Sequence, residues 1–263
     1  MGVQGLELRG SAVRTSENLS ALAASGESRA RQRDIVQLSA RALLFATWDS
    51  QDFAFNNELR LQYDATAFTD GGPGPPIVEP FDYVTATTGV RVPLTRDPTL
   101  PVLPAFVDGV IDSELTPAVP GAFRQAQLRE SAGLAVSTTG PFREVRFGGV
   151  TQQDASAALA VGEDVAFDAG LLGALHLVVP LLDNLVLDET SDARFFFADA
   201  DDRGTDLALR AQSVTRVATP LSSALGGFVF LDAVWLSAKP TPGSIEWNVV
   251  VGAGLTFADV WRL

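Results

Sequence analysis

His176 is the only histidine of the chain, and the chain contains no cysteine. A hydrolase of the serine type would need this imidazole as a general base beside a serine hydroxyl. The residues that share its face at a spacing of two, from Asp168 to Val178, include no serine. We therefore interpret His176 as a histidine on a strand face, and we expect no enzymatic activity.

The acidic segment Asp199–Asp206 has some of the spacing of a calcium loop. An EF-hand needs an oxygen ligand at its fifth position and a glutamate at its twelfth, where this chain has Arg203 and Arg210. We interpret the segment as a solvated hairpin tip with Gly204 in the turn, and a loose surface calcium site is the alternative. Gly148-Gly149 has no helix after it, which predicts a bulge or close strand packing instead of a phosphate loop.

A further set of charged residues shares one property: each lies on the polar face of a segment whose other face is apolar. Their mixed signs would allow ion pairs inside a closed lumen, and no spacing singles out two carboxylates for acid–base catalysis. We predict that these charged side chains face a lumen: Arg41, Glu58, Arg60, Asp64, Arg210, Arg216, Asp232 and Glu246.

The elements that carry these residues show a hydrophobic period of two, which is typical of β-strands. In residues 52–68, Phe53, Leu59 and Tyr63 belong to one apolar face, whereas Glu58 and Arg60 belong to the other. The apolar face of residues 245–257 is bracketed by Trp247 and Phe257, as expected for two aromatic girdles. Phe195-Phe196-Phe197 also fits an interface belt. We expect strands at about 5–15, 34–48, 52–68, 81–94, 102–115, 125–138, 142–150, 164–179, 184–198, 206–219, 226–237 and 245–257.

The expected connections alternate between long and short, which places both termini on the side with short turns. The segment 16–24 has two interpretations, a short helix or an extension of the first strand, and the tail 258–263 either extends the last strand or returns to the barrel mouth. No apolar stretch is long enough for a transmembrane helix, and the given sequence starts without a signal peptide. The pI of about 4.4 excludes a broad basic surface for nucleic acid.

Alternation by itself does not say which face is inside. The mixed charges on the polar faces and the many small residues on the strands favour apolar side chains outside, against lipid. The sequence thus predicts an all-β protein: one closed antiparallel up-and-down transmembrane β-barrel of about 12 strands, with residues 1–263 forming a single outer-membrane domain. A soluble acidic β-sandwich or closed barrel is the alternative. We expect no cofactor and no metal, and the only partner predicted is the lipid bilayer.

Residues 34–68, with Trp48 near their centre and the strand Asn56-Asn57-Glu58-Leu59-Arg60-Leu61-Gln62-Tyr63 after it, resemble an uncharacterised family of outer-membrane β-barrels best known from Bacteroidota. Leu19 stands where that family has a tryptophan. The resemblance implies an outer-membrane barrel and transfers no activity and no functional residue.

Four functions remain open from the sequence. The first is a narrow pore or small-solute channel, and the second is a structural or interaction barrel that binds a partner through loops 16–33, 69–80 and 151–163. The third is a membrane-embedded hydrolase that uses His176, and the fourth is a soluble acidic β-protein. The expected location of the mature protein is the cell outer membrane.

Overall fold

The computed structural model describes residues 2–19, 21–22, 35–50, 52–68, 78–94, 103–114, 125–138, 140–162, 164–199, 202, 206–239, 244–257 and 261–262. Its elements are β1 (Gly2–Thr15), β2 (Ile35–Asp49), β3 (Ala54–Phe68), β4 (Val78–Pro93), β5 (Pro104–Glu114), β6 (Ala126–Ser137), β7 (Phe142–Asp154), α1 (Ser156–Val161), β8 (Ala166–Leu182), β9 (Leu185–Phe196), β10 (Leu207–Pro220), β11 (Leu225–Ala238), β12 (Glu246–Phe257) and β13 (Trp261–Arg262).

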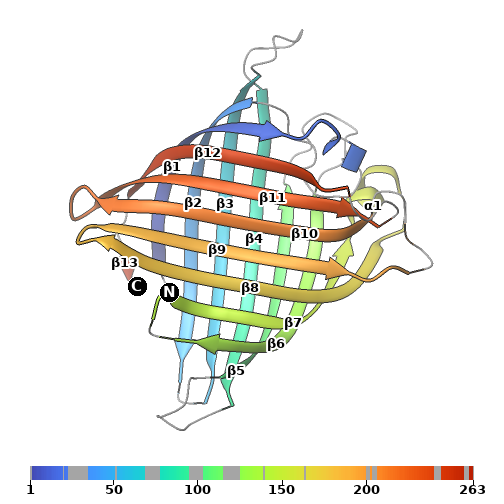
Figure 1. Cartoon of the computed structure of the whole chain (residues 1–263), viewed down its shortest axis with the longest axis horizontal. Coiled ribbons are helices and arrows are strands. Elements are labelled where there is room, and N and C mark those ends of the chain that lie inside the picture. The colour runs from blue at the N-terminus through green and yellow to red at the C-terminus, as the bar shows by residue number, and fades with distance from the viewer. Residues whose placement is uncertain are drawn as a thin grey trace.

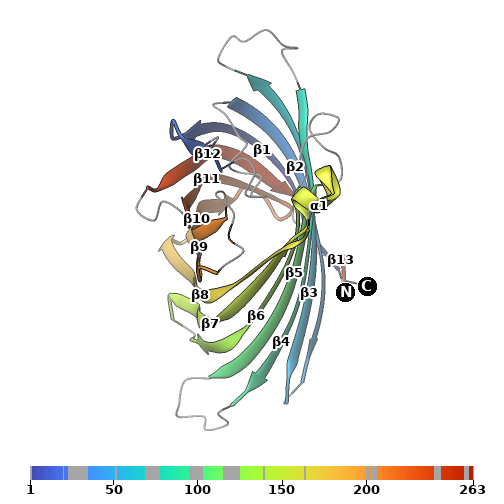
Figure 2. The same ribbon diagram turned by 90° about the vertical axis from the view of Figure 1, so that its right-hand side faces the viewer.

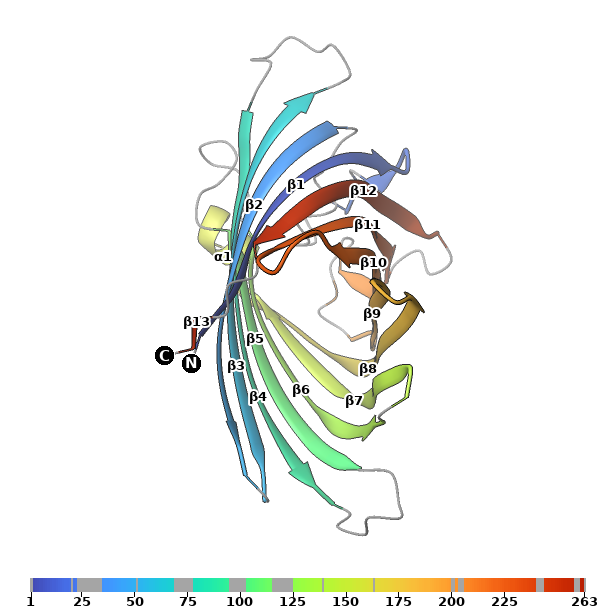
Figure 3. The ribbon, with the colours of Figure 1, turned by 90° about the vertical axis from the view of Figure 1, so that its left-hand side faces the viewer.

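The strands form a closed antiparallel barrel. Each of β1 to β12 pairs with the next strand in sequence, and β12 pairs with β1 from Leu6 opposite Phe257 to Thr15 opposite Asn248. Figures 1, 2 and 3 show the resulting wall from three sides, with both chain ends together at one edge. Closure satisfies the backbone hydrogen bonds of every neighbouring strand pair, and a spanning sheet needs this in lipid.

The barrel has two unlike ends, which we call the turn end and the loop end. At the turn end the connections are 50–53, 94–103, 138–141, 183–184 and 221–224, and at the loop end they are 16–34, 69–77, 115–125, 155–165, 197–206 and 239–245. Both termini lie at the turn end, and β13 pairs there with Gly2 and Val3, so the tail returns to the barrel. The connection 94–103 is longer than the expected 95–101, because β5 begins only at Pro104.

The outer wall is mostly apolar. Leu38, Val107, Ile111 and Val229 are all more than half exposed, because no described residue covers the faces from which they project. Aromatic residues lie near both ends of this wall. They are Trp48, Phe53, Phe142 and Phe257 toward the turn end, and Tyr63, Phe167, Phe195, Phe197, Trp235 and Trp247 toward the loop end. An apolar band between two aromatic girdles is the surface that a lipid bilayer requires.

Among the described residues, carboxylates interrupt this wall at Asp82, which lies opposite the outward Tyr63, and at Glu130 and Glu189. Glu130 accepts a hydrogen bond from Thr151 on the neighbouring strand at 3.2 Å. Glu189 accepts hydrogen bonds from Ser191 at 3.1 Å and from Ser213 at 3.2 Å. These hydroxyl donors reduce the cost of placing a carboxylate on the outer wall.

Two local features differ from the sequence-based expectation. Strand β7 continues to Asp154 and is followed by the helix α1, where we expected a loop over 151–163. Only Phe195 and Phe197 belong to the outer belt, with their ring centroids 6.2 Å apart, whereas Phe196 is buried in the lumen. The pairing of β13 with β1 agrees with the second of the two courses expected for the tail, a return to the barrel mouth. No helix of the described residues is long and apolar enough to cross a membrane.

The inner faces of β6 and β7 come unusually close at two glycines. A Cβ on Gly148 would lie 2.2 Å from the carbonyl oxygen of Ala132, and a Cβ on Gly133 would lie 2.2 Å from that of Phe147. The expectation of close strand packing at Gly148-Gly149 therefore applies to Gly148, while a Cβ on Gly149 would meet its nearest atom only at 3.9 Å.

Candidate functional site: the charged lumen

The lumen carries most of the charged side chains that the sequence analysis singled out. Alternation places them on the face opposite to outward residues such as Leu38, Leu61, Val229 and Trp247, so these side chains point inward. This inner set comprises Arg41, Glu58, Arg60, Arg210, Arg216, Asp232 and Glu246. The side chain of Asp64 lies outside the described residues, although its backbone pairs with Ser39.

One ion-pair cluster joins β1 to β10 in the turn-end half. Glu7 binds the Arg9 guanidinium, and its other oxygen accepts a 2.6 Å hydrogen bond from Arg216. Arg216 also stacks over the ring of Phe228 at 3.8 Å, and Arg9 lies 5.0 Å from the ring centroid of Phe230. Two arginines therefore share one carboxylate above two aromatic rings, an arrangement that lowers the cost of burying the charges.

The glycines of β12 make room for this cluster. A Cβ on Gly254 would lie 2.6 Å from Cζ of Phe228, and a Cβ on Gly252 would lie 2.7 Å from Cε1 of Phe230. The two rings thus fill the space that larger residues on β12 would occupy.

A second cluster joins β4, β5 and β7. Asp108 is buried and binds Arg91 at 2.5 Å and Arg146 at 2.8 Å, and Arg146 also binds Glu144 at 3.0 Å. Phe106 lies beneath both guanidiniums, with their Cζ atoms 5.2 and 5.7 Å from its ring centroid. We did not single out this cluster or the Glu7–Arg9 pair from the sequence. The period-two alternation of their strands was the signal that could have found them.

The loop-end half contains carboxylates with a different kind of partner. Asp154 accepts hydrogen bonds from the side-chain amide of Gln127 at 2.9 Å and from the backbone N–H of Ser156 at 2.8 Å. Glu246 accepts a 2.7 Å hydrogen bond from Ser16 and a 3.4 Å one from Ser244. These donors are neutral, so they solvate the carboxylates without cancelling their charge.

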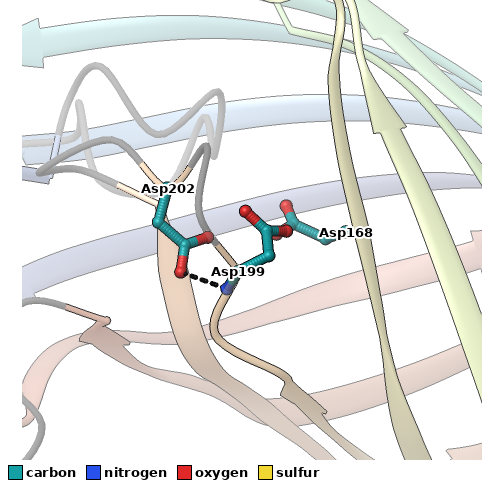
Figure 4. A group of neighbouring side chains, drawn as sticks. All are labelled: Asp168, Asp199 and Asp202. Carbon is teal, nitrogen blue, oxygen red and sulfur yellow. Dashed lines mark hydrogen bonds between the residues drawn. The ribbon is translucent and has the colours of Figure 1, made fainter.

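Three aspartates at the loop end could hold a cation, and Figure 4 shows them together. One carboxylate oxygen of each of Asp168, Asp199 and Asp202 lies within 4.8 Å of the others. The Lys239 ammonium binds Asp168 at 2.6 Å and also binds Asp202, so a positive charge of the protein itself is already at this cluster. The loose surface calcium site considered from the sequence thus has a competing lysine.

The electrostatics of this cluster follow from those contacts. Burial alone would raise the pKa of Asp202, but the Lys239 hydrogen bond and the backbone N–H of Asp199 outweigh it and hold the pKa of Asp202 below its usual value. Burial alone would lower the pKa of Lys239, but its hydrogen bonds to the two aspartates outweigh that effect and raise the pKa of Lys239.

The segment after β1 enters the lumen at the loop end. The backbone N–H of Ser16 donates to the carbonyl of Trp247 at 2.9 Å, and Leu19 and Leu22 are then almost fully buried. They belong to one apolar cluster with inward residues of the wall, among them Leu172, Phe196, Leu207, Val234, Leu236 and Ala238. The two leucines therefore narrow the loop-end half of the lumen, whereas Arg60, His176 and Asp188 in the turn-end half keep two-fifths or more of their side-chain surface exposed.

His176 points into the turn-end half of the lumen. Its Nε2 lies 3.2 Å from Asp188 on the neighbouring strand, and the residues opposite it in register are Glu144 and Thr190. Ser191 and Ser213 of the adjoining strands lie on the outer wall, on the other side of the sheet from this imidazole. The geometry therefore pairs His176 with a carboxylate, and not with either of these serines.

Several solved structures are similar to this chain. The outer membrane phospholipase A from Escherichia coli is similar over 97% of this chain and 97% of its own, with a TM-score of 0.53 and 10% identity. An outer membrane channel from Pseudomonas putida F1 aligns over 97% of this chain and 95% of its own, with a TM-score of 0.47 and 10% identity. The porin NanC aligns over 97% of this chain and 100% of its own, with a TM-score of 0.46 and 9% identity. No family model and no curated protein matches the chain.

The closed barrel, its apolar outer band and its charged interior define the class of protein. The chain is an outer-membrane β-barrel, and the transmembrane orientation expected from the sequence is confirmed.

Proposed function

We propose that this protein is a narrow outer-membrane channel for small solutes, formed by residues 1–263 as a single barrel domain. The observation that carries the proposal is the charged interior of the turn-end half. A barrel that serves only as a scaffold can fill its interior with apolar side chains, whereas partly exposed Arg60, Glu58 and Asp188 keep water and ions in contact with the wall. The resemblance of residues 34–68 to the Bacteroidota barrel family is compatible with this function, and we propose common ancestry with it.

A structural or interaction barrel is the second candidate, because one loop-end connection, 155–165, contains the folded helix α1. A hydrolase is the weakest of the three. The Asp188 carboxylate could orient the His176 imidazole, but Ser191 and Ser213 lie on the other side of the sheet. Because His176 can activate neither of these two serines, we propose that the protein is not an enzyme.

Conductance in planar lipid bilayers tests the proposal directly. Purified protein should give discrete current steps in 1 M KCl, and Arg60→Gln should change the size of the steps, because that side chain is exposed in the lumen. Leu38→Gln, on the outer wall, is the matched control and should leave the size unchanged. Folded, heat-modifiable protein that inserts but carries no current would overturn the channel function.

A further inference from the structure

The carboxylates of the lumen have charged partners in the turn-end half of the barrel, whereas in the loop-end half several have only neutral partners. Toward the turn end, Glu7, Glu58, Asp108, Glu144 and Asp188 each form an ion pair with an arginine or with His176. Two of these carboxylates, those of Glu7 and Asp108, are each held by two guanidiniums. Five arginines belong to these pairs, and Arg41, opposite Glu7 in register, is a sixth, so the turn-end half is close to electrical balance with arginine in slight excess.

The loop-end half also contains an ion pair, that of Asp192 with Arg194 and Arg210, but among the described residues its carboxylates outnumber its cations. Asp154 and Glu246 are held only by amide, hydroxyl and backbone N–H donors. They lie at the loop-end limits of β7 and β12, which are separated by four strands of the closed wall, so the negative charge comes from widely separated parts of the rim.

Two further groups add to the same excess. Asp112, near the end of β5, takes hydrogen bonds from Gln125 at 3.0 Å and Thr85 at 3.1 Å, and its nearest guanidinium, that of Arg129, is 3.8 Å away. Of the three aspartates of Figure 4, Asp168 of β8 and Asp202 of the 197–206 connection share the ammonium of Lys239, and Asp199 lies within 4.8 Å of both.

We propose that the lumen is polarised along its axis, with an acidic loop-end mouth that admits cations and a balanced to weakly basic turn-end half. Rings of carboxylates at a constriction favour cations, and low-dielectric walls focus their field across the opening. Leu19 and Leu22 narrow this same mouth, which brings a permeating ion close to the acidic rim. The solute class is then a small cation, or a zwitterion that enters with its ammonium group first. This selectivity rests on the proposed channel function, but the polarisation of the lumen does not.

The absence of cysteine in the chain allows the potential at each end to be measured without any current. We would make Ser244→Cys, an exposed site beside Glu246 at the loop end, and Asn56→Cys, an exposed site in the turn-end half of β3. Each variant would be modified in detergent with a trimethylammonium methanethiosulfonate and with its sulfonate analogue. The ratio of the two rates, divided by the ratio measured for a small free thiol, reports the sign of the local potential.

A potential of one kT at the loop end changes this ratio by about sevenfold, since it favours the cation and disfavours the anion. We expect a ratio at least that large for Ser244→Cys and a ratio near one for Asn56→Cys. Adding Glu246→Gln and Asp154→Asn to Ser244→Cys should bring the loop-end ratio toward one. Adding Glu58→Gln to Ser244→Cys should not raise the loop-end ratio. Equal ratios at the two ends, or a loop-end ratio that ignores the two rim substitutions, would overturn the polarised lumen.

Bilayer currents separate the two proposals. In a KCl gradient the reversal potential should indicate a cation preference that Glu246→Gln with Asp154→Asn reduces. Polarised reagent ratios with no current would refute the channel and leave the polarised lumen supported. A current without cation preference would refute the proposed cation selectivity but would still support the proposed channel function.

Discussion

The buried leucines after β1 give the sharpest prediction about the width of the lumen. Leu19 is 1% exposed and Leu22 is 6% exposed, and both belong to one apolar cluster with inward residues of β5 to β11. Burying a leucine contributes about 1.5–3 kcal/mol, so the pair contributes roughly 3–6 kcal/mol to the position of this segment. The hydrogen bond from Ser16 to Glu246 adds about 1.5–3 kcal/mol, because its acceptor is charged.

Replacing both leucines with aspartate removes the larger of these contributions and places two carboxylates in an apolar cluster. A loss of about 3 kcal/mol shifts the equilibrium between the inserted and the released segment by roughly a hundredfold. Because the released segment no longer narrows the loop end, we expect the double variant Leu19→Asp/Leu22→Asp to conduct more current per channel than the parent protein.

Single-channel recording in planar bilayers measures the effect. Ala21→Asp is the matched control, since Ala21 is exposed within the same segment and its charge should leave the two leucines in place. Gel mobility with and without heating must first show that each variant is folded. A double variant that is folded and inserted but has the parental conductance would refute the reasoning that these leucines restrict the lumen.

The remaining predictions concern stability. Asp108→Ala leaves Arg91 and Arg146 without their shared carboxylate, so chemical unfolding in detergent should show that the free energy of unfolding falls by about 3 kcal/mol. Glu58→Ala breaks an exposed ion pair and should lower the free energy of unfolding by less than about 1 kcal/mol. Equal losses for the two variants would contradict the buried cluster. Gly148→Val should prevent the β6–β7 approach and abolish heat-modifiable mobility, whereas Gly10→Ala, with nothing within 4 Å of the added carbon, should fold normally. The pKa of Lys239 is higher in the folded protein than in the unfolded chain, where it is about 10.4. The stability that the Lys239 ammonium contributes to the folded state is therefore fully present below that unfolded-state pKa and is lost as the pH rises through the raised pKa. Protease resistance of the 197–206 connection should therefore fall above about pH 10.4, and Lys239→Met should remove that dependence.

Much of the barrel follows from the sequence because side-chain alternation in a strand is a local property. Residues 52–68 and 245–257 separate apolar from polar faces along their whole length, and this pattern predicts both the strands and the two surfaces of the wall. The unequal connections predict which end carries the loops. The same alternation assigns Arg41, Glu58, Arg210 and their companions to the polar face without reference to any other strand.

Which charges meet, and where the lumen narrows, depends on the closed barrel. The register that brings Arg216 to Glu7 is set by the pairing of β12 with β1, a contact between the two ends of the chain that no local pattern encodes. The tertiary structure also brings Lys239 to Asp168 and places Leu19 in one apolar cluster with inward residues of the wall. Side-chain period determines the face on which a residue lies, but strand register and the shear of the closed wall determine its neighbours.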